Sequence, residues 1–119
     1  MCHAGFVPDA DLNAVYNAAT ALISAGVYET SSLPVMEAQA AGVPVVCFRN
    51  PGMVEITDGA ASMYERAEPS CLADAMLAVA DDDRYRADLS SRGLRSVQRF
   101  SWERCARETM SILQEAAAL

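Results

Sequence analysis

Residues 20–48 read TALISAGVYETSSLPVMEAQAAGVPVVCF, and this stretch decides the class of fold. TALIS (20–24) is a short apolar run that fits a buried strand. VPVVCF (43–48) is continuous and β-branched, which is typical of a strand covered on both faces. Between them lie a loop, AGVYETSS (25–32), and a helical stretch that ends at Gly42. This order of strand, helix and strand predicts a parallel pair joined by a right-handed crossover.

The rest of the chain extends the same α/β pattern. Helices are predicted from Asp9, over 33–41, 53–57, 70–80 and 83–98, and from Trp102 to the C-terminal alanines, with a weaker strand over 61–65. Asp9, Asp83 and Ser101 are expected to cap their helices, because short polar side chains accept hydrogen bonds from the free amides of a first turn. Gly93 is expected to interrupt its helix, and Trp102 to pack in the core or at a corner.

The composition indicates a single folded domain spanning residues 1–119, since 52% of the residues are hydrophobic. The net charge is -7 and no residue is a lysine, so neither nucleic acid nor an anionic membrane is an expected partner. No apolar run reaches the ~18 residues of a membrane span, and no signal peptide is recognised. Four scattered cysteines and one histidine predict no zinc site and no disulfide framework, so we expect a cytoplasmic protein without metal or cofactor.

Two predicted loops define a candidate binding rim. Residues 25–32 and Arg49–Gly52 each follow a strand and lead into a helix. In parallel sheets, ligands bind beyond the carboxyl ends of the strands, where such loops meet. Free amides at helix N-termini favour anions, so this edge is expected to bind phosphate and hydroxyl groups.

Two carboxylates belong to this rim. Glu29 lies in the loop and Glu37 about one turn into the following helix. Carboxylates accept hydrogen bonds from sugar hydroxyls, and the free amides at Ser32–Leu33 suit a phosphate. A glycosidase-like acid–base pair is also conceivable. The same spacing is compatible with a solvated Glu29 and with a Glu37 that only interacts with the helix dipole, so these residues alone leave the function open.

The wider pattern resembles the E-x7-E region of the group 1 glycosyltransferases, which have the GT-B fold, use nucleotide sugars and retain anomeric configuration. Five segments are similar to successive parts of the family's C-terminal, donor-binding domain: AGFVPDADLNAVYNAA (4–19), LISAGVYETSSLPVMEAQAAGVPVV (22–46), PGMVEI (51–56), ERAEPSCLADAMLAVADD (65–82) and RGLRSVQRFSWERCARETM (92–110). The resemblance implies a partial Rossmann-like parallel sheet with flanking helices, equal to about half of such a domain, and further C-terminal helices.

The resemblance also implies roles for the rim residues. Glu37 would bind the ribose hydroxyls of a nucleotide-diphosphate sugar. Glu29 would contact the donor sugar and act as a positioning and electrostatic group at the reacting centre. The backbone of Thr30, Ser31, Ser32 and Leu33 would face sugar and phosphate. The implied reaction is transfer of the sugar, with retention, to an acceptor that the sequence does not identify.

The chain departs from the family in ways that bear on activity. Thr30 and Ser32 stand where the family usually has glycine. The diphosphate-binding arginine and lysine, and the acceptor domain, have no counterpart in these residues. We therefore expect the isolated chain to be inactive, and its open sheet edge to invite self-association or a companion domain. The alternatives are a non-catalytic interaction module that kept the fold, and a relative of the nucleotide-sugar 2-epimerases, which share the GT-B architecture.

Overall fold

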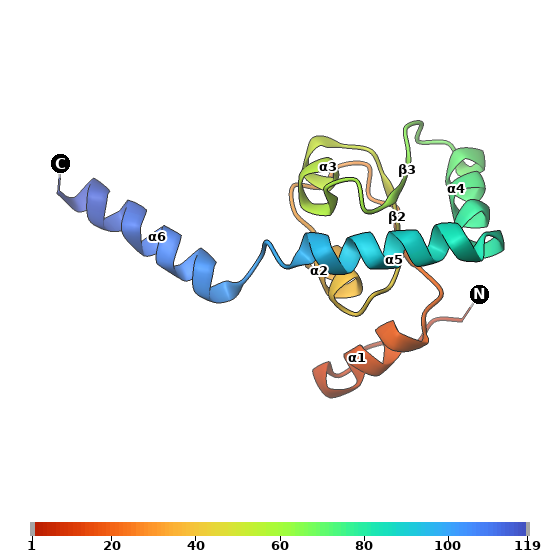
Figure 1. Cartoon of the computed structure of the whole chain (residues 1–119), viewed down its shortest axis with the longest axis horizontal. Coiled ribbons are helices and arrows are strands. Elements are labelled where there is room, and N and C mark those ends of the chain that lie inside the picture. Colours follow the sequence, from red (N-terminus) through yellow and green to blue (C-terminus); the bar gives the residue numbers. More distant parts are fainter. Residues whose placement is uncertain (1, 119) are drawn as a thin grey trace.

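The computed structural model describes residues 2–118. Its first five helices surround a small sheet to form the body of the protein, and the last helix projects from this body (Figure 1). The helices are α1 (Asp9–Ala18), α2 (Leu33–Ala40), α3 (Pro51–Thr57), α4 (Pro69–Asp81), α5 (Asp83–Val97) and α6 (Trp102–Ala117). The strands are β1 (Leu22–Ser24), β2 (Val45–Phe48) and β3 (Ser62–Tyr64). The alternation of helix and strand predicted for the first half of the chain is therefore confirmed.

The three strands form one parallel sheet in the order β1-β2-β3. Leu22 lies opposite Val45, and Val46 lies opposite Ser62, so β2 is paired on both sides. β1 and β3 each pair with β2 alone within the described residues. The α/β class with a partial parallel sheet and flanking helices is thus confirmed.

The central strand β2 is buried on both faces. Val45, Val46 and Cys47 have no exposed surface. Val45 and Cys47 join a cluster with α2 and α3, whereas Val46 joins a second cluster with α4 and α5. Further members are Val35 and Met53 in the first cluster, and Val79 and Leu89 in the second. Burial raises the pKa of the Cys47 thiol to about 11, so this cysteine is an inert core residue at neutral pH.

The first two strands begin two residues later than predicted, and backbone chemistry explains the difference. The amide of Val43 donates to the carbonyl of Ala38 at 2.8 Å, which closes the end of α2. Pro44 has no N–H to donate, and its carbonyl accepts from the amide of Leu22 at 2.8 Å. The regular ladder therefore starts at Leu22 and Val45.

Two of the three predicted helix caps are wrong by one position. The N-cap of α5 is Asp82, whose carboxylate accepts from two amides of the first turn at 2.9 Å, so Asp83 is already helical. The N-cap of α1 is Pro8, which leaves Asp9 as the first helical residue without a capping contact. Ser101 is confirmed as the N-cap of α6, since its hydroxyl accepts from a backbone amide of the first turn at 3.1 Å.

The predicted interruption at Gly93 is also wrong, because α5 runs through it without a break. A Cβ placed on Gly93 would lie 3.2 Å from the Cγ of Gln39, so the glycine allows α5 to approach α2 closely. The buried amide of Gln39 donates to the carbonyl of Ala60 at 3.2 Å. One turn before Gly93, Ser90 donates to the carbonyl of Gly42 at 2.6 Å. The contacts of Gly93 and Ser90 hold α5 against the C-terminal end of α2.

Arginines of the α5 region bind backbone carbonyls near the end of α3. Arg99 donates to the carbonyls of Glu55 at 3.0 Å and Ile56 at 3.2 Å. Arg92 donates to the carbonyl of Gly59 and forms a salt bridge with an aspartate one turn earlier in α5. A guanidinium suits this position because the last carbonyls of a helix lack partners within the helix.

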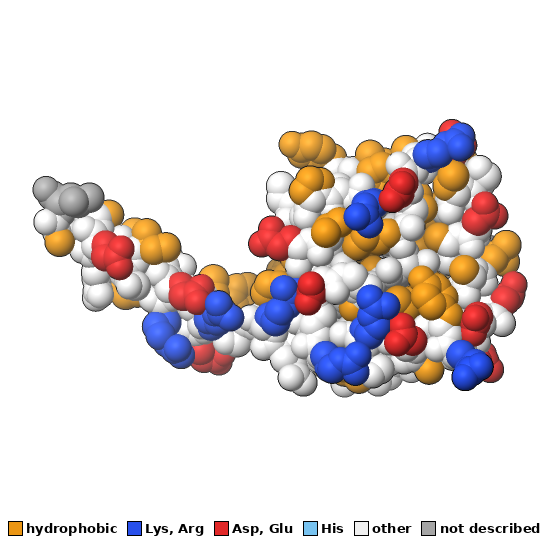
Figure 2. All heavy atoms as spheres, turned by 45° about the horizontal axis from the view of Figure 1, so that its top comes forward, with side chains coloured by type: hydrophobic (Ala, Val, Ile, Leu, Met, Phe, Trp, Pro, Cys, Tyr) orange, Lys and Arg blue, Asp and Glu red, His pale blue; other side chains and the backbone are white. Residues whose placement is uncertain are grey.

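The last helix has no buried residue, and its apolar side chains face solvent. The exposed fraction of Trp102 is 73%, so the predicted core or corner position is wrong. The reason is visible in Figure 1, where α6 leaves the body directly after α5 and projects away from the sheet and the helices that cover it. Hydrophobic side chains are correspondingly visible along α6 in the space-filling view (Figure 2). The largest of them are Trp102, Met110, Ile112 and Leu113.

We predict that truncating Leu89 and Leu113 to alanine will have very different effects. Leu89, on α5, is 1% exposed and belongs to the core cluster that contains Val46 of β2. Leu89→Ala should therefore lower the free energy of unfolding by about 2–5 kcal/mol. Leu113 is 58% exposed on α6, so Leu113→Ala should change it by less than about 0.5 kcal/mol. Urea denaturation followed by circular dichroism measures both. Equal losses would contradict the exposed placement of α6.

Candidate functional site

The two loops of the predicted rim meet in the structure. β1 and β2 are parallel neighbours, so the loops after them emerge at the same edge of the sheet. Gly52, in the first turn of α3, lies directly against the first loop. A Cβ placed on it would be 2.5 Å from the carbonyl oxygen of Thr30 and 2.7 Å from that of Glu29. Only glycine permits this approach, and the contact sets the position of the loop that carries Glu29.

Glu29 is half-buried and folds back over its own loop. Its Cγ and Oε1 atoms would each be 3.1 Å from a Cβ placed on Gly26. Among residues 2–118, no hydrogen bond or salt bridge engages its carboxylate. The side chains of Thr30 and Ser31 are exposed beside it. Glu29 is therefore a carboxylate at the carboxyl edge of the sheet that remains available to a ligand.

The first turn of α2 is left without a side-chain cap. Its N-cap residue, Ser32, is 8% exposed, and its hydroxyl accepts no hydrogen bond from the helix amides. The neighbouring α3 differs, because the side chain of Asn50 accepts from the amide of Met53 at 2.9 Å. Amides at the start of a helix favour anions, and those following Ser32, at Leu33 and Val35, keep that capacity.

Glu37 lies on the exposed side of α2 and is held by a residue of another helix. The hydroxyl of Tyr16, on α1, donates to its Oε2 at 2.8 Å. Within the described residues Glu29 shares no hydrogen-bond partner with Glu37, so the two carboxylates are held differently. The spacing of the two glutamates gives no indication of this tyrosine, because Tyr16 lies 21 residues before Glu37 in the chain.

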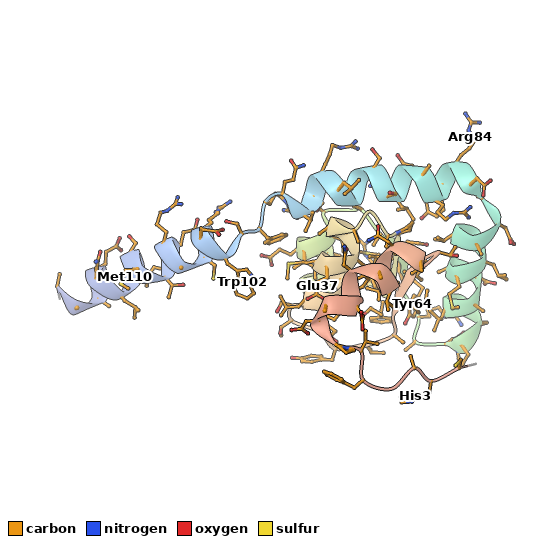
Figure 3. All side chains as sticks on the ribbon, turned by 90° about the horizontal axis from the view of Figure 1, so that it is seen from below. His3, Glu37, Tyr64, Arg84, Trp102 and Met110 are labelled. Carbon is orange, nitrogen blue, oxygen red and sulfur yellow. The ribbon has the colours of Figure 1, made fainter. Side chains whose placement is uncertain are left out.

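A groove of about 800 Å³ lies between α2 and the start of α6. Leu33, Met36 and Glu37 form one wall, and Trp102 and Ile112 belong to the other. In Figure 3, Glu37 and Trp102 lie on the two sides of the space between the body and α6. The sequence pattern did not predict this groove, because its walls come from segments that are distant in the chain.

The charged groups at this edge are few. Arg49 follows β2 and forms a salt bridge with Glu65 after β3, with 3.5 Å between Nε and Oε1. Within residues 2–118, no three His, Cys, Asp or Glu side chains come together to hold a metal ion. No helix in that range has the length and apolar character needed to cross a membrane. The edge therefore offers carboxylates, hydroxyls and backbone amides as its binding groups.

Comparison with known proteins assigns this arrangement to a family. The family described as "Glycosyl transferases group 1" matches residues 2–82, which include both loops of the rim and all three strands. The chain belongs to the group 1 glycosyltransferases. The family membership implied by the motifs is thus confirmed.

Two curated group 1 relatives illustrate the extent of the match. O-antigen chain mannosyltransferase B of Escherichia coli is 34% identical over 107 residues, covering 90% of this chain and 28% of that protein. D-inositol 3-phosphate glycosyltransferase of Corynebacterium kroppenstedtii is 33% identical over 111 residues, covering 92% of this chain and 25% of that protein. The chain therefore spans about a quarter of the length of these relatives.

A solved structure shows the same fold. Sucrose-phosphate synthase from Thermosynechococcus elongatus aligns with a TM-score of 0.76 and 25% identity, covering 87% of this chain and 27% of that one. The GT-B architecture expected for this group 1 glycosyltransferase is confirmed for the part that the chain represents.

We predict that Gly52→Ala will destabilise the rim more than Gly26→Ala. The new methyl at position 52 would collide with the backbone carbonyls of residues 29 and 30, and strain of this kind costs about 1–3 kcal/mol. At position 26 the neighbour is the side chain of Glu29, which can rotate away. Thermal unfolding of the two variants measures the difference. Equal stabilities of the two variants would show that the loop at residues 29 and 30 moves away from α3 with little loss of free energy.

Proposed function

We propose that this chain forms part of the donor-binding domain of a glycosyltransferase that moves a sugar from a nucleotide diphosphate to an acceptor with retention. The observation that carries the proposal is the arrangement at the carboxyl edge of the sheet. There, Glu29 and Glu37 stand before and after a helix start whose amides have no side-chain cap. This combination suits a ligand that has both hydroxyl groups and a diphosphate.

Each residue receives the role that the resemblance to the group 1 glycosyltransferases implies. Glu37 accepts hydrogen bonds from the ribose hydroxyls, and Glu29 accepts them from the donor sugar. The backbone from Thr30 to Leu33 faces the sugar and the phosphates. Glu29 acts as a positioning and electrostatic group, while donors aimed at the leaving diphosphate stabilise its developing charge.

Thr30 and Ser32, which stand where the family usually has glycine, have different consequences for a bound ligand. The side chain of Ser32 is 8% exposed and lies largely inside the protein, which argues against steric crowding of a ligand. Thr30 is exposed at the rim, next to Glu29. We therefore assign any steric restriction on the donor sugar to Thr30.

We further propose that the chain alone transfers sugar poorly and acts together with other residues in the cytoplasm. It has no lysine, and Arg49 at the rim is already paired with Glu65. Few positively charged side chains are therefore available at the rim to stabilise the negative charge of a leaving diphosphate. A companion domain would supply the missing cations and the acceptor site.

Calorimetric titration with UDP, GDP and their sugar conjugates tests the donor site. We expect weak binding of at least one nucleotide, and a roughly tenfold loss in Glu37→Ala because hydrogen bonds to a charged group disappear. Glu115→Ala, which removes the same charge near the end of α6, should bind as the unchanged chain does. The absence of binding at millimolar nucleotide would contradict the proposed donor site.

A second candidate function is a non-catalytic interaction module. The open edge of β1 and the exposed apolar side of α6 favour it, because both surfaces invite a partner. Either surface would serve a companion domain or a second copy of the chain.

Sedimentation analysis distinguishes the two surfaces. If the sheet edge mediates self-association, Ile23→Lys should reduce it, because a charge on an edge strand blocks further pairing. We expect this result, since Ile23 lies in the middle of β1 and is 36% exposed. Leu113→Glu is the matched change on α6. Loss of association in Leu113→Glu alone would place the interface on the helix instead.

A further inference from the structure

Tyr16 connects the core of the protein to the candidate ribose site. It lies on α1, and its ring packs against the buried cluster that contains Val45 and Met53. Its hydroxyl leaves this cluster and donates to Oε2 of Glu37 at 2.8 Å. Tyr16 is therefore anchored at one end by packing and bonded to the carboxylate at the other.

The protonation state of Tyr16 suits a permanent donor. Burial, followed by the hydrogen bond to Glu37 and by the charge of that carboxylate, raises the pKa of Tyr16 to about 12. The phenol consequently keeps its proton throughout the neutral range. The direction of the hydrogen bond is fixed as well, because an ionised carboxylate can only accept.

The hydrogen bond removes freedom from a side chain that would otherwise move. Glu37 is exposed, and the side chain of a free glutamate loses up to ~2 kcal/mol of rotamer entropy when it is fixed. Because Tyr16 already restricts the carboxylate, ligand binding costs less rotamer entropy at Glu37. A carboxylate offers about four acceptor positions, so one bond from Tyr16 leaves room for two neighbouring hydroxyls.

We propose that Tyr16 is a positioning residue for nucleotide recognition, which presents the Glu37 carboxylate to the 2′ and 3′ hydroxyls of the ribose. This inference rests on the proposed donor site and adds α1 to it. Figure 3 shows α1 beside Glu37, on the same side of the body. Tyr16 acts through Glu37 and does not itself contact the ligand.

The test compares ribonucleotides with nucleotides that lack the ribose hydroxyls. GDP, UDP and their 2′,3′-dideoxy forms are titrated calorimetrically into the 119-residue chain and into Tyr16→Phe. The phenylalanine keeps the packing of the ring and removes only the donor. We expect the affinity for GDP or UDP to fall about tenfold, while the affinity for the dideoxy forms changes less than about twofold.

Two further variants make the result specific. Tyr85→Phe removes the hydroxyl of a tyrosine on α5 that packs against the other core cluster, and it should leave all affinities unchanged. In a Glu37→Gln background, Tyr16→Phe should have a much smaller effect, because the two residues act as one unit. Thermal unfolding of every variant accompanies the titrations. The ratio of ribonucleotide to dideoxynucleotide affinity does not depend on the fraction of folded protein.

The outcomes separate this inference from the proposed function. Selective loss of ribonucleotide affinity in Tyr16→Phe supports the positioning role. If the unchanged chain prefers ribonucleotides and Tyr16→Phe keeps that preference, the role of Tyr16 is overturned and the donor site stands. Equal weakening of both nucleotide forms would make Tyr16 a purely structural residue. If the unchanged chain binds no nucleotide, the donor site and this inference both fail.

Discussion

The burial of β2 on both faces is the constraint on which the rest of the structure depends. Val45, Val46 and Cys47 have no exposed surface, so helices must cover both sides of a sheet that is only three strands wide in the described residues. Parallel pairing on both edges of β2 then places the ends of neighbouring strands together. The loops that carry the candidate site lie at one edge as a direct consequence.

Helix α5 completes this arrangement from outside the sheet. Its glycine at position 93 allows it to touch α2, and Arg92 and Arg99 bind carbonyls around the end of α3. Both helices that begin at the rim are thus secured away from the rim itself. A rigid support of this kind matters because ligand contacts on loops depend on the elements that hold them.

The side chains and amides of the rim suit the binding of a sugar nucleotide better than the stabilisation of its leaving group. Its carboxylates and amides are groups that can bind hydroxyls and phosphate oxygens, whereas the net charge of -7 and the absence of lysine provide little positive charge to stabilise a leaving diphosphate. The chain spans about a quarter of the length of the curated relatives. In the proposed function, hydroxyl recognition and charge stabilisation would belong to different parts of the enzyme. The hydrogen bond from Tyr16 to Glu37 would strengthen the proposed recognition of hydroxyls.

The sequence by itself determined the family and the α/β class, and it predicted which edge of the sheet carries the candidate site, because β-branched runs, glycines and prolines act within a few residues of the chain. Tertiary structure alone decided the contacts that shape this edge. Tyr16 meets Glu37 across 21 residues of sequence, and Gly52 meets the carbonyl of Thr30 from the next strand–helix unit. Trp102 lines the groove between α2 and α6 because α6 projects from the body and does not bury this side chain. Such contacts depend on how helices pack, and no local pattern encodes that packing.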